Sequence, residues 1–265
     1  MDLTLKMLQM PPILLLALLV IASSLIGSIC TYFFKKYIKI KILGSHNEVT
    51  GYVFGSVAGL YGLLLAFVIF LVWDQFNGAQ QTADMEGSVA KGLYRNIVYY
   101  PDSESVKIKT IYMAYVKNVV DTEYPLIAQG KTSPETIRHF DEVFKAIEHL
   151  NPSADYKSRR VEEMFRNLNS LSTYRSLRLL DAGSDIPLII WIPLLLGGFI
   201  TMMLAMILNI ENRRLHVFIN GLLGAFIGMI LFLIILIDHP FTGSMNIQPK
   251  GYLQILSMDQ RPDNL

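Results

Sequence analysis

The chain has 265 residues, of which 52% are hydrophobic and 17% charged, and its mean hydropathy is +0.39. That composition is too apolar for an ordinary soluble domain of this size, so it indicates an integral membrane protein. The net charge of +1 excludes nucleic acid as the main partner, because a nucleic-acid-binding protein needs a clear cationic excess. The single cysteine, Cys30, excludes an intrachain disulfide.

Four apolar stretches are each close to the roughly 20 residues that a helix needs to cross about 30 Å of hydrocarbon. We expect membrane spans at about residues 13–34, 52–73, 186–208 and 215–237. Pro11 and Pro12 suit the first helical turn of the first span. This run is longer than the apolar part of a cleaved signal peptide, and only Lys6 precedes it as a basic residue, so we expect it to be retained.

The spans divide the chain into four parts. These are an N-terminal transmembrane pair in 1–73, an extramembrane helical domain in 74–185, a C-terminal transmembrane pair in 186–237 and a tail in 238–265. The expected fold class is therefore all-α: an integral membrane protein with four transmembrane helices and a helical bundle inserted between spans two and three.

The middle segment shows helical periodicity throughout. Apolar or small residues recur every three or four positions in 75–99, in 103–124, from 133 onward and from about 153 to 179. Pro101 is expected to end the first of these helices and Pro125 and Gly130 the second, whereas Ser133 and Pro134 are typical of a helix start. Four helices with one apolar stripe each predict a bundle.

The second span is expected to continue directly into the first extramembrane helix, because no proline lies between Tyr52 and Arg95. Gly51, Gly55 and Gly59 are spaced four residues apart, so one face of its first half carries almost no side chain. Two interpretations stay open: this face packs closely against another helix, or it lines a pore in an oligomer.

Two short loops carry clustered basic residues, namely Lys35, Lys36, Lys39 and Lys41 after the first span and Arg213 and Arg214 before the fourth. The positive-inside rule places both loops in the cytoplasm. The N terminus, the 74–185 domain and the C terminus are then non-cytoplasmic, which for a bacterial inner membrane means the periplasm. The basic residues within 74–185 do not alter this prediction, since long segments translocate largely regardless of charge.

The sequence indicates neither catalysis nor a cofactor. Its five histidines lack metal-ligand spacing, and it contains no glycine-rich phosphate loop and no nucleophile elbow. We therefore expect no enzyme, no catalytic residues, no metal and no cofactor. An ion-coupled transporter is also disfavoured, because Asp74 and the pair Asp238 and His239 lie at span ends rather than at mid-membrane.

Three stretches of the sequence carry a family resemblance. The first is Tyr61-Gly62-Leu63-Leu64-Leu65-Ala66-Phe67, which leads to Trp73 and is followed by Glu86 and Leu93-Tyr94-Arg95. The second is Arg175 with Arg178-Leu179, and the third is Asp238-His239-Pro240-Phe241-Thr242-Gly243. Together they resemble the bestrophin-like domain family of prokaryotic four-span membrane proteins. The last stretch is similar to the family's signature of aspartate, basic residue, proline, phenylalanine, small residue and glycine after the final span. Gly87 departs from the family, in which alanine is usual after the glutamate.

The resemblance implies an oligomeric ion channel or channel-like pore, with anions favoured by analogy alone. The pore candidates are Gly55, Gly59, Phe67, Phe70 and Asp74. The signature residues expected to be structural are Glu86, Arg95, Arg175, Arg178, Asp238, His239, Pro240, Phe241 and Gly243. We expect the three arginines to pair with Glu86, Asp74 or Asp238, and Phe241 to pack at the membrane interface.

The expected partners are the lipid bilayer, further copies of the chain and small inorganic ions. Two alternatives stay open: a non-conducting membrane-anchored scaffold or sensor, and an accessory subunit of a larger membrane complex.

Overall fold

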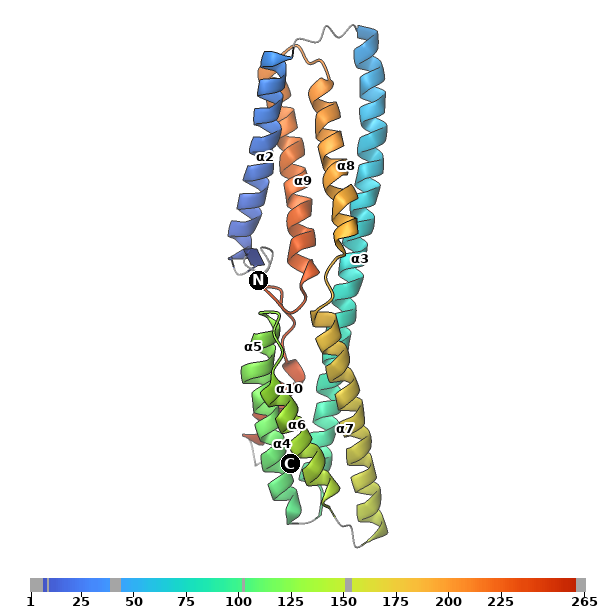
Figure 1. Cartoon of the computed structure of the whole chain (residues 1–265), viewed down its shortest axis with the longest axis vertical. Helices are drawn as coiled ribbons and strands as arrows, with labels where there is room; N and C mark the ends of the chain where they lie inside the picture. Colours follow the sequence, from blue (N-terminus) through green and yellow to red (C-terminus); the bar gives the residue numbers. More distant parts are fainter. Residues whose placement is uncertain (1–6, 9, 39–43, 102, 151–153, 261–265) are drawn as a thin grey trace. The chain divides into compact units, whose positions relative to one another are not determined.

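The computed structural model describes residues 7–8, 10–38, 44–101, 103–150 and 154–260, and every regular element in these ranges is helical (Figure 1). The expected all-α class is thus confirmed. The chain divides into a membrane unit, Met1–Gln75 with Asp185–Asp238, and a bundle unit, Phe76–Ser184 with His239–Leu265. Lys39 and Lys41 of the first basic loop, and the expected helix start near Ser153, lie outside the described residues.

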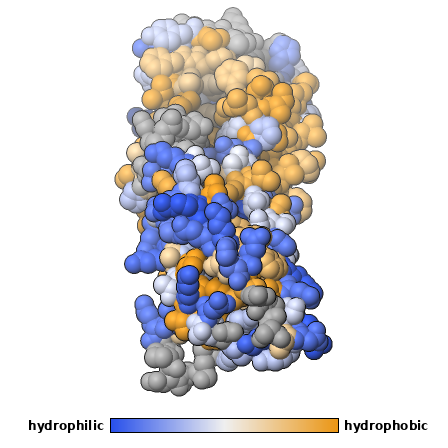
Figure 2. Space-filling view, turned by 60° about the horizontal axis from the view of Figure 1, so that its bottom comes forward, coloured by the Kyte–Doolittle hydropathy of each residue, from blue (hydrophilic) through white to orange (hydrophobic). Residues whose placement is uncertain are grey.

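Within the described ranges, four helices are long and apolar enough to cross a membrane, which agrees with the expected number of spans. They are α2 (Pro12–Tyr37), α3 (Gly44–Val98), α8 (Leu188–Ile207) and α9 (Arg213–Asp238). Large apolar side chains such as Leu18 and Phe199 are exposed on the membrane unit. Figure 2 shows this contrast on one face: apolar residues cover much of the membrane unit, whereas hydrophilic residues dominate the bundle unit.

The helix α3 is continuous over 55 residues, as the absence of proline predicts. Its residues up to Gln75 belong to the membrane unit and those from Phe76 onward to the bundle unit.

Small residues bring α2 and α9 together in the membrane unit. A Cβ added to Gly224 would collide with the carbonyl oxygen of Ser23, and one added to Gly228 would lie 2.6 Å from the carbonyl oxygen of Leu19. Close backbone approach of this kind is the usual basis of helix association in lipid. Glycines of α9 therefore mediate the close contact between α2 and α9.

The bundle unit contains the rest of α3, α4 (Glu104–Asn118), η1 (Val119–Glu123), α5 (Tyr124–Ile127), α6 (Pro134–Glu148), α7 (Asp155–Ala182) and α10 (Lys250–Asp259). Their apolar stripes meet in one core, which includes Tyr112, Val143 and Leu168. The tail contributes to the same core through Tyr252 and Ile255 of α10, a helix that the sequence periodicity did not predict.

The expected helix end at Pro125 is wrong, because helical structure continues to Ile127. The segment Val119–Glu123 forms a π-helical turn, in which the N–H of Tyr124 bonds to the carbonyl of Val119. Pro125 then lies in the first turn of a new α-helical segment, where a missing N–H costs little. Gly130, with a positive φ of 70°, follows as the turn residue.

Candidate functional site

The pore candidates of α3 lie on an exposed face of the membrane unit. The side chains of Phe67 and Phe70 are 59% and 63% exposed, and Asp74 is also exposed. A Cβ added to Gly55 or Gly59 meets no described atom within 4 Å. Close packing against the described part of the chain therefore does not explain the glycines at positions 55 and 59, which leaves a second copy, lipid or an ion pathway to cover them.

The opposite face of α3 holds the helix in its unit. Tyr61, Leu65 and Val68 are buried there. A Cβ added to Gly198 of α8 would lie 2.8 Å from the Tyr61 hydroxyl, so the absence of a side chain on α8 makes room for this ring. The two faces of α3 are thus distinct: one packs on the chain and the other is free for an assembly.

A second candidate lies in the bundle unit, where four charged residues meet inside the core. We call Glu86, Glu123, Arg175 and Arg178 the charge cluster. Arg175 is 9% exposed and the other three have no exposed surface. Each occupies a core position of its helix, and the apolar neighbours on the same stripes are Ala83 and Ala90 on α3, Val119 on η1, and Leu168 and Leu171 on α7.

Arg178 is the centre of the charge cluster. Its Nε and Nη2 donate to the two carboxylate oxygens of Glu86, with an Nη2–Oε1 distance of 3.1 Å, and Nη2 also donates to Glu123 Oε2 at 2.7 Å. The guanidinium lies over the Tyr124 ring, with Cζ 4.6 Å from the ring centroid. Burial alone would lower the pKa of Arg178, but the adjacent Glu86 and Glu123 hold it well above its usual value, so the side chain stays charged.

Glu123 reaches the charge cluster from the last position of the π-helical turn η1. Arg175 donates to it through Nη2 and, at 3.4 Å, through Nε. Glu123 therefore bridges Arg175 and Arg178. Because a π-helical turn contains more residues than an α-helical turn, it changes the direction in which the following side chains point.

Two buried tyrosines complete the network. The Tyr252 hydroxyl of α10 donates to Glu86 Oε1 at 2.7 Å. The Tyr115 hydroxyl lies 3.3 Å from that of Tyr252, whose proton is already committed, so Tyr115 donates in this contact. Burial, together with the charge of Glu86, raises the pKa of both tyrosines and keeps them protonated as donors.

The charges of the cluster balance, and each of its four carboxylate oxygens accepts at least one hydrogen bond. Both carboxylates are fully buried and already accept hydrogen bonds from arginine or tyrosine donors, so neither is accessible to a substrate as a general base. The arrangement therefore suits a structural lock that ties α3, η1, α7 and α10 together.

The structure brings together only some of the expected pairs. Arg178 pairs with Glu86, but Arg95 is exposed and does not, so the predicted Arg95–Glu86 pair is wrong. The reason is register: Arg95 lies on the outer face of α3, whereas Glu86 lies on the buried stripe. The expected partner Asp238 instead accepts a hydrogen bond from the N–H of Ile186 at 2.9 Å, within the membrane unit.

The remaining signature residues form a turn in the bundle unit. Pro240 is buried, and its carbonyl accepts from the N–H of Ile247 at 2.8 Å. Gly243 has a φ of 78°, a left-handed conformation that favours glycine. Phe241 packs edge-on against Tyr124, with ring centroids 6.2 Å apart, and is part of the bundle core. Its expected position at the membrane interface stays a prediction, since Phe241 follows the end of α9 by three residues. His239, next to Pro240, is partly buried.

Sequence reasoning missed Glu123, Tyr115 and Tyr252 as members of the network. A signal for Glu123 was present, since it follows Val119 by four residues on an apolar stripe. A charged residue at a core position needs buried partners, and Arg175 and Arg178 occupy such positions on another helix.

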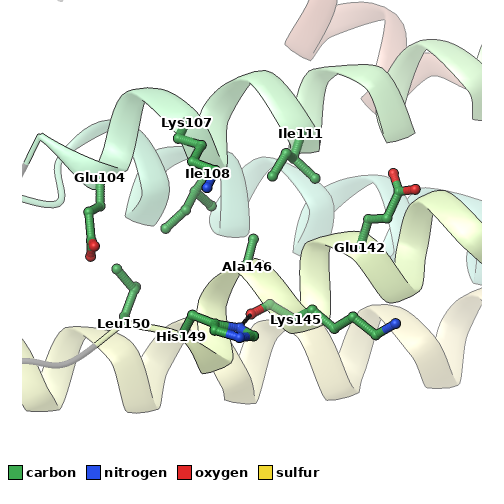
Figure 3. Close-up of a pocket in the computed structure, with 9 residues that line it drawn as sticks. All are labelled: Glu104, Lys107, Ile108, Ile111, Glu142, Lys145, Ala146, His149 and Leu150. Carbon is green, nitrogen blue, oxygen red and sulfur yellow. Dashed lines mark hydrogen bonds between the residues drawn. The ribbon is translucent and has the colours of Figure 1, made fainter.

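A shallow pocket lies between α4 and α6 of the bundle unit (Figure 3). Its apolar floor includes Ile108 and Leu150, and its rim carries acidic and basic side chains, namely Glu104, Glu142, Lys107 and Lys145. The mixture of charges gives the pocket no marked preference for ligand charge.

Comparison with known proteins agrees with this architecture. A family model described as a bestrophin-like domain matches residues 21–252. The chain is similar in structure to a bacterial bestrophin homologue from Klebsiella pneumoniae, with a TM-score of 0.64 and 15% identity over 94% of this chain and 96% of that one. A single-substitution variant of that homologue gives a TM-score of 0.65 and 14% identity over 92% and 98% of the two chains. Among curated proteins no match was found.

Proposed function

Because the chain belongs to the bestrophin-like family, we propose that it assembles as a homo-oligomer in a membrane and forms a passive pathway for small inorganic ions along α3. The carrying observation is the exposed face with Gly55, Gly59, Phe67, Phe70 and Asp74 on a helix otherwise packed in the membrane unit. Anions are the proposed ions, by analogy with the channels after which the family is named.

The chemistry of this face supports a two-part pathway. Phe67 and Phe70, three residues apart, would repeat around an oligomer axis as apolar rings, and hydrophobic constrictions gate pores by excluding water. Asp74, one turn further along α3, would form a ring of carboxylates that disfavours anions. If the pathway conducts anions, they pass this ring against its negative charge. We therefore expect Asp74 to reduce anion flux rather than assist it.

Chloride efflux from vesicles that contain the purified full-length chain tests the proposal. Vesicles with protein should release chloride faster than empty vesicles, Asp74→Asn should increase the rate, and Phe67→Ala should widen the constriction and increase it further. Leu18→Ala, an exposed position on α2, is the matched control and should change nothing. A folded oligomer that releases no chloride in any variant would contradict the proposal and favour the non-conducting scaffold.

We further propose a bacterial inner membrane as the location, with the bundle unit on the non-cytoplasmic side. The support is the clustering of basic residues in the two short loops. No enzymatic reaction is proposed, since the buried carboxylates of the charge cluster are each held by arginine.

A further inference from the structure

A surface cavity of about 410 Å³ lies on the bundle unit between α3 and α10. One face of α3 from Ser88 to Val98 forms most of its lining, and Tyr99, just after the helix, and Met258 of α10 complete it. This volume falls in the range of small-molecule sites in proteins.

The polar groups of the cavity are mostly hydrogen-bond donors, and two of them are cationic. Lys91 and Arg95 both line it and are four residues apart on α3, a spacing that places their side chains side by side. No carboxylate belongs to its described lining. The lysine amine donates to the uncharged Oε1 of Gln254 at 2.8 Å, a bond that leaves its positive charge unbalanced.

The surrounding groups strengthen this positive field. Arg160 of α7 donates to the carbonyl of Tyr99 at 3.0 Å, which places a third cation at the edge of the cavity. The acid at the end of α10, Asp259, accepts a hydrogen bond at 3.2 Å from the hydroxyl of Tyr94 in the lining, but it is also ion-paired with Lys109 at 2.6 Å, so its charge is already balanced by that lysine. The cavity therefore differs from the pocket in Figure 3, where acidic and basic residues alternate on the rim.

Gly92 also lies in the lining, and the Asn167 side chain of α7 packs beside it, so that a Cβ added at position 92 would be 3.6 Å from the amide nitrogen and 3.8 Å from the amide oxygen. The charged donors of the cavity are therefore the ammonium group of Lys91 and the guanidinium group of Arg95. The ligand that matches two such neighbouring donors is an oxyanion.

We propose that this cavity binds a phosphate group, either as inorganic phosphate or as a phosphate monoester. Arg95 supplies the planar, bidentate contact and Lys91 a second, point-like charge. The site lies wholly within the bundle unit and does not depend on conduction. It also gives Arg95 a role other than the ion pair with Glu86 that the sequence suggested.

The test is titration calorimetry of the full-length protein in detergent with inorganic phosphate and, separately, with glycerol 3-phosphate, at constant ionic strength set by sodium chloride. One phosphate should bind per chain, and Arg95→Gln should weaken binding by about tenfold or more, as expected for loss of a charge-assisted contact. Lys91→Gln should weaken it less, and Arg95→Lys should restore part of the affinity. If glycerol 3-phosphate binds at least as tightly as inorganic phosphate, the monoester is the better ligand of the same site.

Arg166→Gln is the control, because Arg166 is an exposed α7 arginine that pairs with Glu163 outside the cavity. It should bind phosphate as the unaltered chain does. The proposal is overturned if neither phosphate compound binds, if chloride competes as well as phosphate at equal ionic strength, or if Arg166→Gln loses as much affinity as Arg95→Gln. Should Arg95→Gln alter the elution or melting of the protein, Lys91→Gln alone decides between these outcomes.

Discussion

Arg178 and Glu86, 92 residues apart in the chain, form an ion pair in which neither side chain has any exposed surface. The pair joins α7 to α3 inside the bundle core. Breaking it by removal of one partner leaves the other charge buried without compensation, which costs far more than the loss of an exposed ion pair. The bundle is therefore expected to depend on the charge cluster more than on any ion pair at its surface.

Removal of Arg178 gives the first prediction. Arg178→Ala should lower the free energy of unfolding of the bundle by about 3–5 kcal/mol, because Glu86 and Glu123 lose their shared donor. Guanidinium-induced unfolding followed by circular dichroism measures the change. Arg166→Ala, whose side chain is 74% exposed, should alter stability by no more than about 0.5 kcal/mol. Equal midpoints for the two variants would count against a buried lock.

Arg95 provides a further check on this assignment. Exchange of the residues at positions 86 and 95 should leave the bundle as unstable as Glu86→Arg alone, since Arg95 lies on the outer face of α3. Recovery of stability in the exchanged chain would show that these two positions pair in solution.

Alkaline pH gives the second prediction. Burial raises the pKa of Tyr112, Tyr115 and Tyr252 above the value of about 10 that a tyrosine has in an unfolded chain. Since the folded state favours the protonated hydroxyls, their contribution to stability is fully present below about pH 10 and is lost as the pH rises further. The bundle should thus unfold in alkali as these hydroxyls ionise.

Absorbance at 295 nm measures this titration. The buried tyrosines should ionise only as the bundle unfolds, so part of the rise in absorbance should coincide with the loss of helical circular dichroism. Tyr252→Phe should reduce the part that accompanies unfolding. A single reversible step that includes all 13 tyrosines would refute the buried network.

Much of the fold could be predicted because its signals are local. Hydrocarbon-length apolar runs identify the four spans, and the absence of proline from 52 to 95 predicts a continuous α3. The tail was harder to interpret, since α10 is only 10 residues long and its burial depends on two positions, Tyr252 and Ile255, that meet a distant core. Short helices of this kind are fixed by tertiary contacts rather than by periodicity.

The candidate site could be predicted only in part for the same reason. The signature motif identified Glu86 and Arg178, but their pairing depends on how α3 and α7 rotate about their axes, which no local pattern sets. The π-helical turn at Val119–Glu123 departs from regular helix geometry. Pro125 predicts an irregularity in this region of the helix but not its type. The sequence correctly predicted that the face with Gly55 and Gly59 carries almost no side chain. What covers this face could not be predicted, because it depends on contacts outside the single chain.

The contact between Gly87 and Gly251 gives the third prediction. A Cβ on Gly87 would lie 2.9 Å from the Cα of Gly251, so the glycine that departs from the family's usual alanine matches a close backbone approach by α10. Gly87→Ala should therefore destabilise the docking of α10, despite the better helix propensity of alanine. Gly78→Ala, which meets no described atom within 4 Å, should stabilise α3 by up to about 1 kcal/mol. The midpoint temperature of thermal unfolding, measured for both variants, tests this prediction. If Gly87→Ala raises the midpoint as much as Gly78→Ala does, α10 does not pack against Gly87.

Two glycines of the membrane unit give the fourth prediction. Gly228→Val should prevent close packing of α2 on α9, because even a Cβ there meets the carbonyl of Leu19 at 2.6 Å. Gly59→Val should leave the chain folded, since its face is open, and should instead change oligomer size or chloride flux. Size-exclusion chromatography in detergent and the vesicle assay separate the two effects. If Gly59→Val aggregates as Gly228→Val does, the α3 face is needed for folding of the single chain.

The orientation of the chain gives the fifth prediction. Lys35 donates to the carbonyl of Leu208 at 3.1 Å and to Asn209 Oδ1 at 3.3 Å, so the two basic loops share one end of the membrane unit. The positive-inside rule then assigns both loops to the cytoplasm together. In a chain that carries Cys30→Ser, a cysteine introduced by Glu148→Cys in α6 should react with a membrane-impermeant maleimide added to intact bacterial spheroplasts, whereas Glu211→Cys between α8 and α9 should react only after lysis. The reverse pattern would invert the orientation, and with it the compartment of the proposed phosphate site, while leaving the four spans in place.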